Sequence, residues 1–180
     1  MTKSTKIISH VQQIETDSEW NDLPMEKHEK DQIQELVKWL KENKSGSRSK
    51  SRNHLALFGG SSIEAKSITA GLLGKLSGQD VYRIDLSSII SKYIGETEKN
   101  LDAVFNKTKN LNGILFFDEA DALFGKRSEV KDSHDRYANL EVSYLLKKIE
   151  DHNGLVILSV TSPKKVDESL LKRVKTIIEI

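Results

Sequence analysis

Apolar positions in this chain fall into short runs that alternate with longer segments in which apolar residues recur at helical spacing. The short runs have the length of buried strands and lie at residues 55–58, 81–85, 114–117, 155–160 and 176–180. Helical segments are expected to begin near Lys66, Glu96 and Ser133, each between two of these runs. This alternation predicts an α/β fold, in which helical crossovers connect the strands of a parallel sheet.

The N-terminal part of the chain is less regular. The first residues are polar and show no sustained period, which predicts a flexible arm over residues 1–19. Apolar residues at helical spacing between Ile33 and Leu40 predict an amphipathic helix that packs on the sheet. The basic, Ser-rich segment 44–52 follows, and a solvated linker is the expected structure there. One folded domain is therefore expected over residues 20–180.

Composition limits the classes of partner. The chain has 180 residues, of which 37% are apolar, and this suffices for one domain with a core. The formal net charge of +1 provides no bulk attraction to nucleic acid, so nucleic acid is not expected as a partner. No apolar run approaches the roughly 20 residues that span a bilayer, and no membrane partner is expected. Because the chain also lacks cysteine, we expect a cytoplasmic protein.

Two adjacent carboxylates, Asp118 and Glu119, follow the apolar run 114–117 directly. Open α/β sheets bind ligands at the carboxyl ends of their strands. The pattern is the Walker B motif of P-loop ATPases, in which Asp118 would hold Mg²⁺ through its water shell and Glu119 would orient and deprotonate the attacking water. Taken alone, the same two residues could also cap the next helix.

A degenerate phosphate-binding loop follows the first strand. The pattern G-x-x-x-x-G-K-[ST] is met at Gly60, Lys66 and Ser67, with Ala65 in place of the second glycine. Lys66 would offer its ammonium group to the terminal phosphates, and Ser67 its hydroxyl to Mg²⁺. An alanine held in the left-handed region costs roughly 1 to 2 kcal/mol, so a weakened loop is expected. A strand, turn and helix with a chance Lys-Ser pair is the alternative. The expected cofactor-binding residues of this loop are Gly60, Ser61, Ser62, Ile63, Glu64, Ala65, Lys66 and Ser67.

Three segments resemble the large nucleotide-binding domain of AAA+ ATPases, and the likeness extends from about Trp20 to the C-terminus. Residues 91–101 resemble the pore loop and following helix of AAA unfoldases, and residues 116–127 resemble their Walker B segment. Residues 20–23 resemble the segment whose backbone borders the adenine. Over residues 126–139 the chain is similar to bacterial AAA ATPases, some of which accompany contractile injection systems.

The resemblance implies a P-loop NTPase fold of three layers, α/β/α, with five parallel strands in the order 5-1-4-3-2. It implies ATP and Mg²⁺ as cofactors, bound between subunits of a homo- or hetero-oligomeric ring that acts on a polypeptide substrate. Lys92, Tyr93 and Ile94 would form the substrate pore loop, with Tyr93 as the gripping residue. A tyrosine packed at the start of a helix is the alternative. Asp22 and Leu23 would border the adenine.

At several positions that match functional residues of the family, this chain has a different residue or one whose role is open. The sensor asparagine falls on Thr161, whose hydroxyl has a shorter reach than an amide. Lysines occupy the positions that align with the arginine fingers, so Arg173 is the candidate finger if the register shifts by one. Arg127 and Arg136 match positions toward the ring interior, where solvated charges are equally plausible.

Further departures favour a weak nucleotide site. Relatives carry glycine where Ile63 and Ala65 stand, and the chain stops at Ile180, where a small helical lid is expected in the family. Three functions follow from this sequence. The first is an ATP-hydrolysing remodeller, with doubtful turnover by this chain alone. The second is a pseudo-ATPase interaction module, and the third is a nucleic-acid-associated module that uses segment 44–52.

Overall fold

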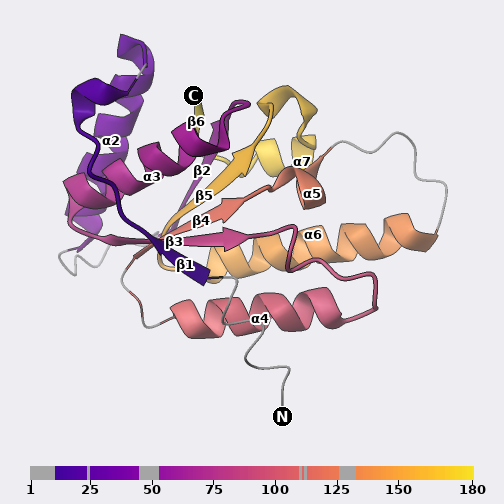
Figure 1. Cartoon of the computed structure of the whole chain (residues 1–180). Coiled ribbons are helices and arrows are strands. Elements are labelled where there is room, and N and C mark those ends of the chain that lie inside the picture. Colours follow the sequence, from indigo (N-terminus) through magenta and orange to yellow (C-terminus); the bar gives the residue numbers. More distant parts are fainter. Residues whose placement is uncertain (1–10, 24, 45–52, 110, 112, 126–132) are drawn as a thin grey trace.

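The computed structural model describes residues 11–23, 25–44, 53–109, 111, 113–125 and 133–180 (Figure 1). Its centre is a six-stranded sheet with the order β1-β3-β4-β5-β2-β6. Five strands run parallel: β2 (Asn53–Gly59), β3 (Asp80–Asp85), β4 (Gly113–Asp118), β5 (Gly154–Val160) and β6 (Thr176–Glu179). Numbered along the chain, these five strands have the spatial order 5-1-4-3-2, so the predicted fold class and strand order are confirmed.

The sixth strand, β1 (Val11–Ile14), was not predicted. It pairs antiparallel with β3, where Val11 lies opposite Ile84 and Ile14 lies opposite Val81. The two apolar residues of β1 are three positions apart, so they point to opposite faces of the sheet and pack on different core clusters. The strand therefore shows no period of two, and the prediction of a flexible arm is wrong for these residues.

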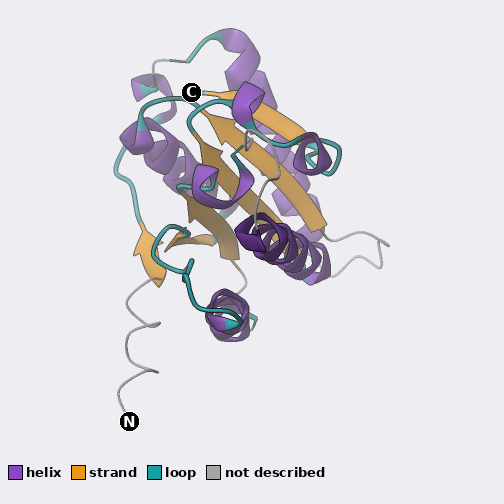
Figure 2. Cartoon of the chain, turned by 90° about the vertical axis from the view of Figure 1, so that its right-hand side faces the viewer, coloured by secondary structure: helices purple, strands orange, loops and turns teal. Residues whose placement is uncertain are grey.

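Helices cover both faces of the sheet (Figures 1 and 2). The helices α2 (Lys27–Lys44) and α3 (Ile63–Ser77) lie on one face. The other face carries α4 (Glu96–Thr108) and α6 (Ser133–Asp151). Each face has its own apolar cluster, and β4 contributes alternate residues to both. Every residue of β4 is buried, which explains its unbroken apolar sequence.

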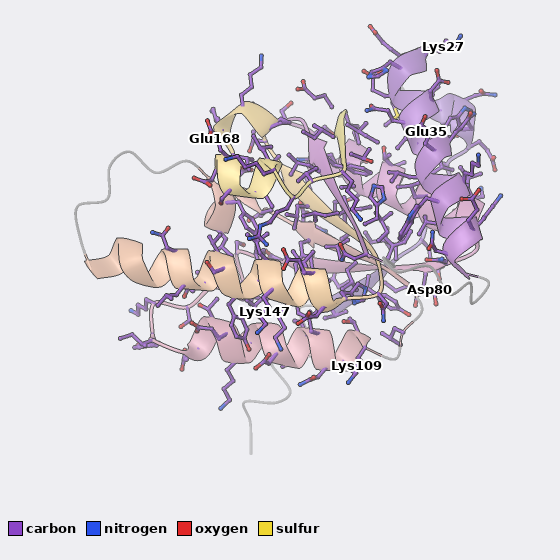
Figure 3. The ribbon with its side chains drawn as sticks, turned by 180° about the vertical axis from the view of Figure 1, so that it is seen from behind. Lys27, Glu35, Asp80, Lys109, Lys147 and Glu168 are labelled. Carbon is purple, nitrogen blue, oxygen red and sulfur yellow. The ribbon has the colours of Figure 1, made fainter. Side chains whose placement is uncertain are left out.

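The predicted amphipathic helix is confirmed in α2, where Ile33, Leu36 and Leu40 are buried against the sheet. Short helices complete the fold: η1 (Trp20–Asp22), α5 (Asp121–Phe124), η2 (Pro163–Lys165) and α7 (Glu168–Leu171). Figure 3 shows charged side chains such as Lys27 and Glu35 on the outside of the helices.

Parts of three sequence predictions fall beyond the described residues, and one of these parts is the stretch 1–10 of the predicted arm. The basic segment 44–52, except for the end of α2, and Arg127 lie outside them, as does the side chain of Arg136 in α6. Among the helices that the structure describes, none is long and apolar enough to cross a membrane.

His54 of β2 gives the fold a pH dependence. Its ring contacts Trp39 edge to face, with the centroids 5.0 Å apart, and its Nε2 lies 2.9 Å from Thr176 Oγ1. Burial, with a smaller contribution from Lys175, lowers the pKa of His54 from 6.5 to about 4. The unfolded chain therefore takes up a proton that the folded chain excludes between these pH values. We expect the free energy of unfolding to fall by about 1 to 3 kcal/mol as the pH decreases from 6.5 to 4.

Urea unfolding followed by circular dichroism at neutral and mildly acidic pH measures this effect. The substitution His54→Gln is expected to flatten the pH dependence. Some slope remains, because burial also lowers the pKa of His152. A slope as steep in His54→Gln as in the unmodified chain would show that His54 does not carry the effect.

Candidate functional site

A pocket of about 320 Å³ lies at the carboxyl ends of the parallel strands. Three strand ends contribute to it: the turn after β2, the end of β4 and the end of β5. The structure brings the following predicted site residues together there: Gly60, Ser61, Ile63, Lys66, Asp118, Glu119 and Thr161. Three more lining residues, Asp121, Ala122 and Ser159, were not predicted. The pocket has the size and position expected of a small-molecule site.

The turn between β2 and α3 is only three residues long, because α3 already begins at Ile63. Gly60 has a φ of +141°, and a Cβ built there would lie 1.9 Å from the carbonyl oxygen of Ile180. Glycine is thus required at the first position of the turn. Ser62 caps the helix by accepting a hydrogen bond from the Ala65 N–H at 3.1 Å.

The expected strain at Ala65 is wrong for this conformation. Ala65 lies in the first turn of α3, and among the described non-glycine residues a positive φ occurs only at Glu119. The cap at Ser62 and the carboxylate of Glu64 in the first turn both favour a helix that starts here. Helix therefore replaces most of the open loop that would surround a phosphate, and Glu64 places a negative charge at the same helix end.

Lys66 is 3% exposed, and its ammonium group points across the pocket edge to β5. Its Nζ donates a hydrogen bond to the Val160 carbonyl oxygen at 2.9 Å. Burial lowers the pKa of Lys66, while the carboxylates of Asp118 and Asp121 act to raise it. The structure thus holds the ammonium group of Lys66 near two carboxylates at the carboxyl edge of the sheet.

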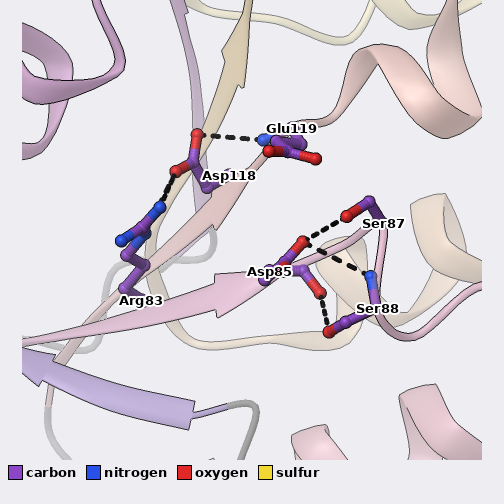
Figure 4. A network of polar contacts seen from close by, with 6 residues as sticks. All are labelled: Arg83, Asp85, Ser87, Ser88, Asp118 and Glu119. Carbon is purple, nitrogen blue, oxygen red and sulfur yellow. Dashed lines mark hydrogen bonds and ion pairs between the residues drawn. The ribbon is translucent and has the colours of Figure 1, made fainter.

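Asp118 and Glu119 differ sharply in environment. Asp118 is completely buried, its Oδ1 accepts the Glu119 N–H at 2.9 Å, and its Oδ2 accepts two hydrogen bonds from Arg83 (Figure 4). Glu119 is exposed and has a φ of +54°, a conformation that non-glycine residues adopt at a cost. Glu119 lines the pocket, whereas Asp118 is held within the sheet by its hydrogen bonds.

Asp121 joins the ends of β4 and β5. Its Oδ2 accepts hydrogen bonds from the Thr161 N–H and the Thr161 hydroxyl, both at 2.7 Å. Because that hydroxyl proton is donated to Asp121, Thr161 keeps only acceptor capacity toward a water molecule in the pocket. A sequence signal for Asp121 did exist, since it is the third acidic residue within four positions of the strand end.

The predicted pore loop lies between β3 and α4, outside the pocket. Tyr93 is 61% exposed and Ile94 is 76% exposed, so the alternative of a tyrosine packed at a helix start is contradicted. The Ser91 hydroxyl donates to Glu96 at 2.7 Å and accepts the Tyr93 N–H at 3.2 Å, and these bonds give the loop a defined shape. The Lys92 ammonium lies 5.5 Å from the centre of the Tyr93 ring.

Comparison with known proteins assigns the fold to a family. Residues 56–180 match the model of the ATPase family associated with various cellular activities, AAA. The chain belongs to the AAA family. Over 161 residues this AAA domain is 29% identical to a Cell division cycle protein 48 homolog from Archaeoglobus fulgidus, an alignment that covers 85% of the chain and 22% of the relative. Over 129 residues it is 32% identical to human spastin, covering 66% of the chain and 20% of spastin. The chain therefore spans only about a fifth of the length of these relatives.

The side chains of the AAA domain fit a magnesium ion bound together with a nucleotide. The hydroxyl oxygens of Ser67 and Ser159 are buried and have no hydrogen-bond partner among the described residues. Of the two expected metal ligands, Asp118 lines the pocket, whereas Ser67 is not among its lining residues. Mg²⁺ commonly uses one or two protein oxygens together with substrate phosphates. No group of three acidic, histidine or cysteine residues that could hold a metal is found in the described part of the chain.

Some predicted residues of the AAA domain do not line the pocket. Within the predicted loop these are Ser62, Glu64, Ala65 and Ser67. Asp22 accepts the Glu19 N–H at 2.7 Å, Leu23 is buried, and neither residue lines the cavity. Arg173 forms an ion pair with Glu150 at the C-terminal end of α6. That pair lies toward the amino ends of the strands, because Lys175 nearby bonds to Asn53 at the start of β2. Arg173 therefore does not serve the pocket of its own chain.

Proposed function

We propose that this AAA domain binds ATP with Mg²⁺ in the pocket and couples ATP binding and hydrolysis to the remodelling of a polypeptide within an oligomeric ring. The observation that supports it best is the convergence of Lys66, Asp118 and Glu119 on one pocket at the carboxyl edge of the sheet. Bound Mg²⁺ would neutralise charge on the phosphates. Lys66 would bind the terminal phosphates, which requires its ammonium group to leave the Val160 carbonyl.

The proposed hydrolytic step depends on Glu119, which lines the pocket and whose carboxylate would accept a proton from the attacking water. Thr161, held by Asp121, would accept a hydrogen bond from the same water. The exposed loop at Tyr93 and Ile94 would contact an extended polypeptide in the ring channel. The sequence likeness over residues 126–139 is the support for an association with contractile injection systems.

The turn at residues 60–62, between β2 and α3, favours a second function, an interaction module with weak or no ATP turnover. We call this segment the phosphate turn. Only three residues separate β2 from α3, and Ser62 already accepts the Ala65 N–H that an open loop would direct to a phosphate. ATP binding to this conformation must either unwind the first turn of α3 or use the few free N–H groups. Low affinity is the expected consequence.

Isothermal titration calorimetry with ATP, in the presence and absence of Mg²⁺, tests the proposed function. Saturable binding that strengthens with Mg²⁺ is expected. No binding at millimolar ATP, by a chain shown to be folded by circular dichroism, would reject the ATPase and leave the interaction module.

Restoring glycine to the phosphate turn is expected to tighten ATP binding. The double variant Ile63→Gly/Ala65→Gly weakens the first turn of α3, because each glycine in a helix costs about 1 kcal/mol. Opening this turn to bind phosphate then costs less free energy, and ATP affinity should rise by about tenfold. The same variant should lower the free energy of unfolding by about 1 to 2 kcal/mol. Calorimetry and urea unfolding measure the two effects.

A glycine at the far end of the same helix is the matched control. Leu76 lies in the last turn of α3 and is 37% exposed. Leu76→Gly should lower stability without changing ATP affinity. Equal affinities in the unmodified chain and the double variant would show that the early start of α3 does not limit binding.

A further inference from the structure

Arg83 is a charged residue on β3, a strand that lies between β1 and β4 in the sheet. It lies on β3 and pairs in register with Phe116 of β4, so Asp118 is its diagonal neighbour on the same face. Side chains at diagonal positions of adjacent strands are within reach of one another when one of them is long. Figure 4 shows the guanidinium group of Arg83 reaching along the strands to the carboxylate of Asp118.

Arg83 donates two hydrogen bonds to one oxygen of the Asp118 carboxylate. Arg83 Nη2 lies 2.5 Å and Nε 3.0 Å from the same oxygen, Asp118 Oδ2. The other oxygen, Oδ1, is taken by the Glu119 N–H at 2.9 Å. The Asp118 side chain is 1% exposed, whereas that of Arg83 is 35% exposed. A buried carboxylate is thereby paired with a guanidinium group whose side chain is partly exposed to solvent.

Arg83 selects Asp118 although a second carboxylate is nearby. Asp85 is the register partner of Asp118 at the end of β3. Its Oδ1 accepts the Ser87 hydroxyl at 2.7 Å and the Ser88 N–H at 3.3 Å, so it is turned into the following loop (Figure 4). The ammonium group of Lys66 is bonded to Val160 instead. The charge of Asp118 is thus balanced by a hydrogen-bonded ion pair with Arg83.

We propose that Arg83 is a positioning residue that holds Asp118 while no metal is bound and competes with Mg²⁺ for this carboxylate. The inference rests on the proposed role of Asp118 as a magnesium ligand. A cation that approaches Asp118 meets a carboxylate whose charge is already neutralised and whose Oδ2 is occupied twice. Binding of the metal therefore requires the guanidinium group to move, and the Arg83 side chain is partly exposed to solvent. Arg83 raises the Mg²⁺ concentration that the site needs.

The first experiment measures metal binding without nucleotide. Thermal unfolding is followed over a millimolar range of MgCl₂, with matched ionic strength, for the unmodified chain, Arg83→Gln and the double variant Arg83→Gln/Asp118→Asn. Arg83→Gln should have a lower Tm without Mg²⁺, since the buried carboxylate loses its hydrogen-bonded ion-pair partner and keeps only the nearby charge of Lys66, and Mg²⁺ should restore part of the loss. The unmodified chain and the double variant should not respond.

Arg173→Gln is the matched control, because it also breaks an arginine ion pair, with Glu150, but away from the pocket. It should lack the Mg²⁺ response. Should Arg83→Gln fail to fold, Arg83→Lys keeps one positive charge without the guanidinium fork and should show a smaller response of the same sign. The inference would be overturned if Mg²⁺ left the Tm of both Arg83 variants unchanged, as it is expected to do for the unmodified chain.

A second experiment separates this inference from the proposed function. Calorimetry with ATP should show that the Mg²⁺ concentration at half-maximal enhancement of binding is about tenfold lower in Arg83→Gln than in the unmodified chain. A metal response of Arg83→Gln without ATP binding by either protein would reject the proposed function and support the role of Arg83. ATP binding with the same Mg²⁺ requirement in both proteins would support the proposed function and overturn the role of Arg83.

Discussion

Replacing Glu119 with glutamine is expected to lower ATP hydrolysis by about 10²- to 10⁴-fold, the usual contribution of a general base. ATP binding should remain within about twofold of the unmodified chain, because glutamine keeps the shape of the side chain and only the basic group is lost. Glu119 is exposed at the pocket and carries its strained φ of +54° with either side chain, so the fold should be kept. Phosphate release at saturating ATP, together with calorimetric affinity, measures the two quantities.

The control is a glutamate remote from the pocket. Glu35 is exposed on α2, on the outside of the molecule (Figure 3), and Glu35→Gln removes the same charge without touching the site. Its hydrolysis rate should equal that of the unmodified chain. A rate in Glu119→Gln that matches the control would remove Glu119 from its proposed role. An unmodified chain that binds ATP but releases no phosphate would favour the interaction module.

The second large effect is expected at Lys66. Lys66→Met should weaken ATP binding by about ten- to a hundredfold, because a charge-assisted hydrogen bond to phosphate contributes about 1.5 to 3 kcal/mol. Folding stability should change by less than about 1 kcal/mol. Methionine fills similar space and removes a buried ammonium group, and the Val160 carbonyl still accepts the Gly60 N–H at 3.1 Å. Calorimetry and thermal unfolding test the two statements.

Lys75 provides the matched control for Lys66. It lies on the same helix, α3, and forms an exposed ion pair with Glu19 at 2.7 Å. Lys75→Met removes one lysine from α3 away from the pocket, and exposed pairs of this kind contribute about 1 kcal/mol or less. Its ATP affinity should be unchanged. The proposed phosphate contact of Lys66 would be ruled out by equal affinities in the two variants.

The phosphate turn shows why a motif alone does not define its conformation. The sequence places Gly60, Lys66 and Ser67 at the spacing of a phosphate loop, and the structure places Lys66 at the pocket as this spacing requires. The same residues also permit an ordinary helix start, because Ser62 can cap and Ala65 has a high helix propensity. Which of two locally allowed backbones is adopted depends on contacts with the neighbouring strands, and these are not visible in the motif.

The pair Arg83 and Asp118 shows a second limit. A charged residue within the apolar run 81–85 is a visible anomaly in the sequence, and it could have indicated a buried partner. The identity of that partner depends on the register of β3 against β4, which aligns Asp85 with Asp118 and so makes Arg83 the diagonal neighbour of Asp118. Register is set by packing across the whole sheet rather than by any short segment.

The sequence by itself determined the parallel strands, the helix at 33–40, and the Asp118–Glu119 pair at a strand end, because burial on both faces and helical spacing leave direct patterns of apolar residues. Only the tertiary structure decided the edge strand β1, the closed turn before α3, and the partners of Asp118 and Thr161. Each of these depends on residues distant in the chain that meet across the sheet, and a local pattern carries no information about such meetings.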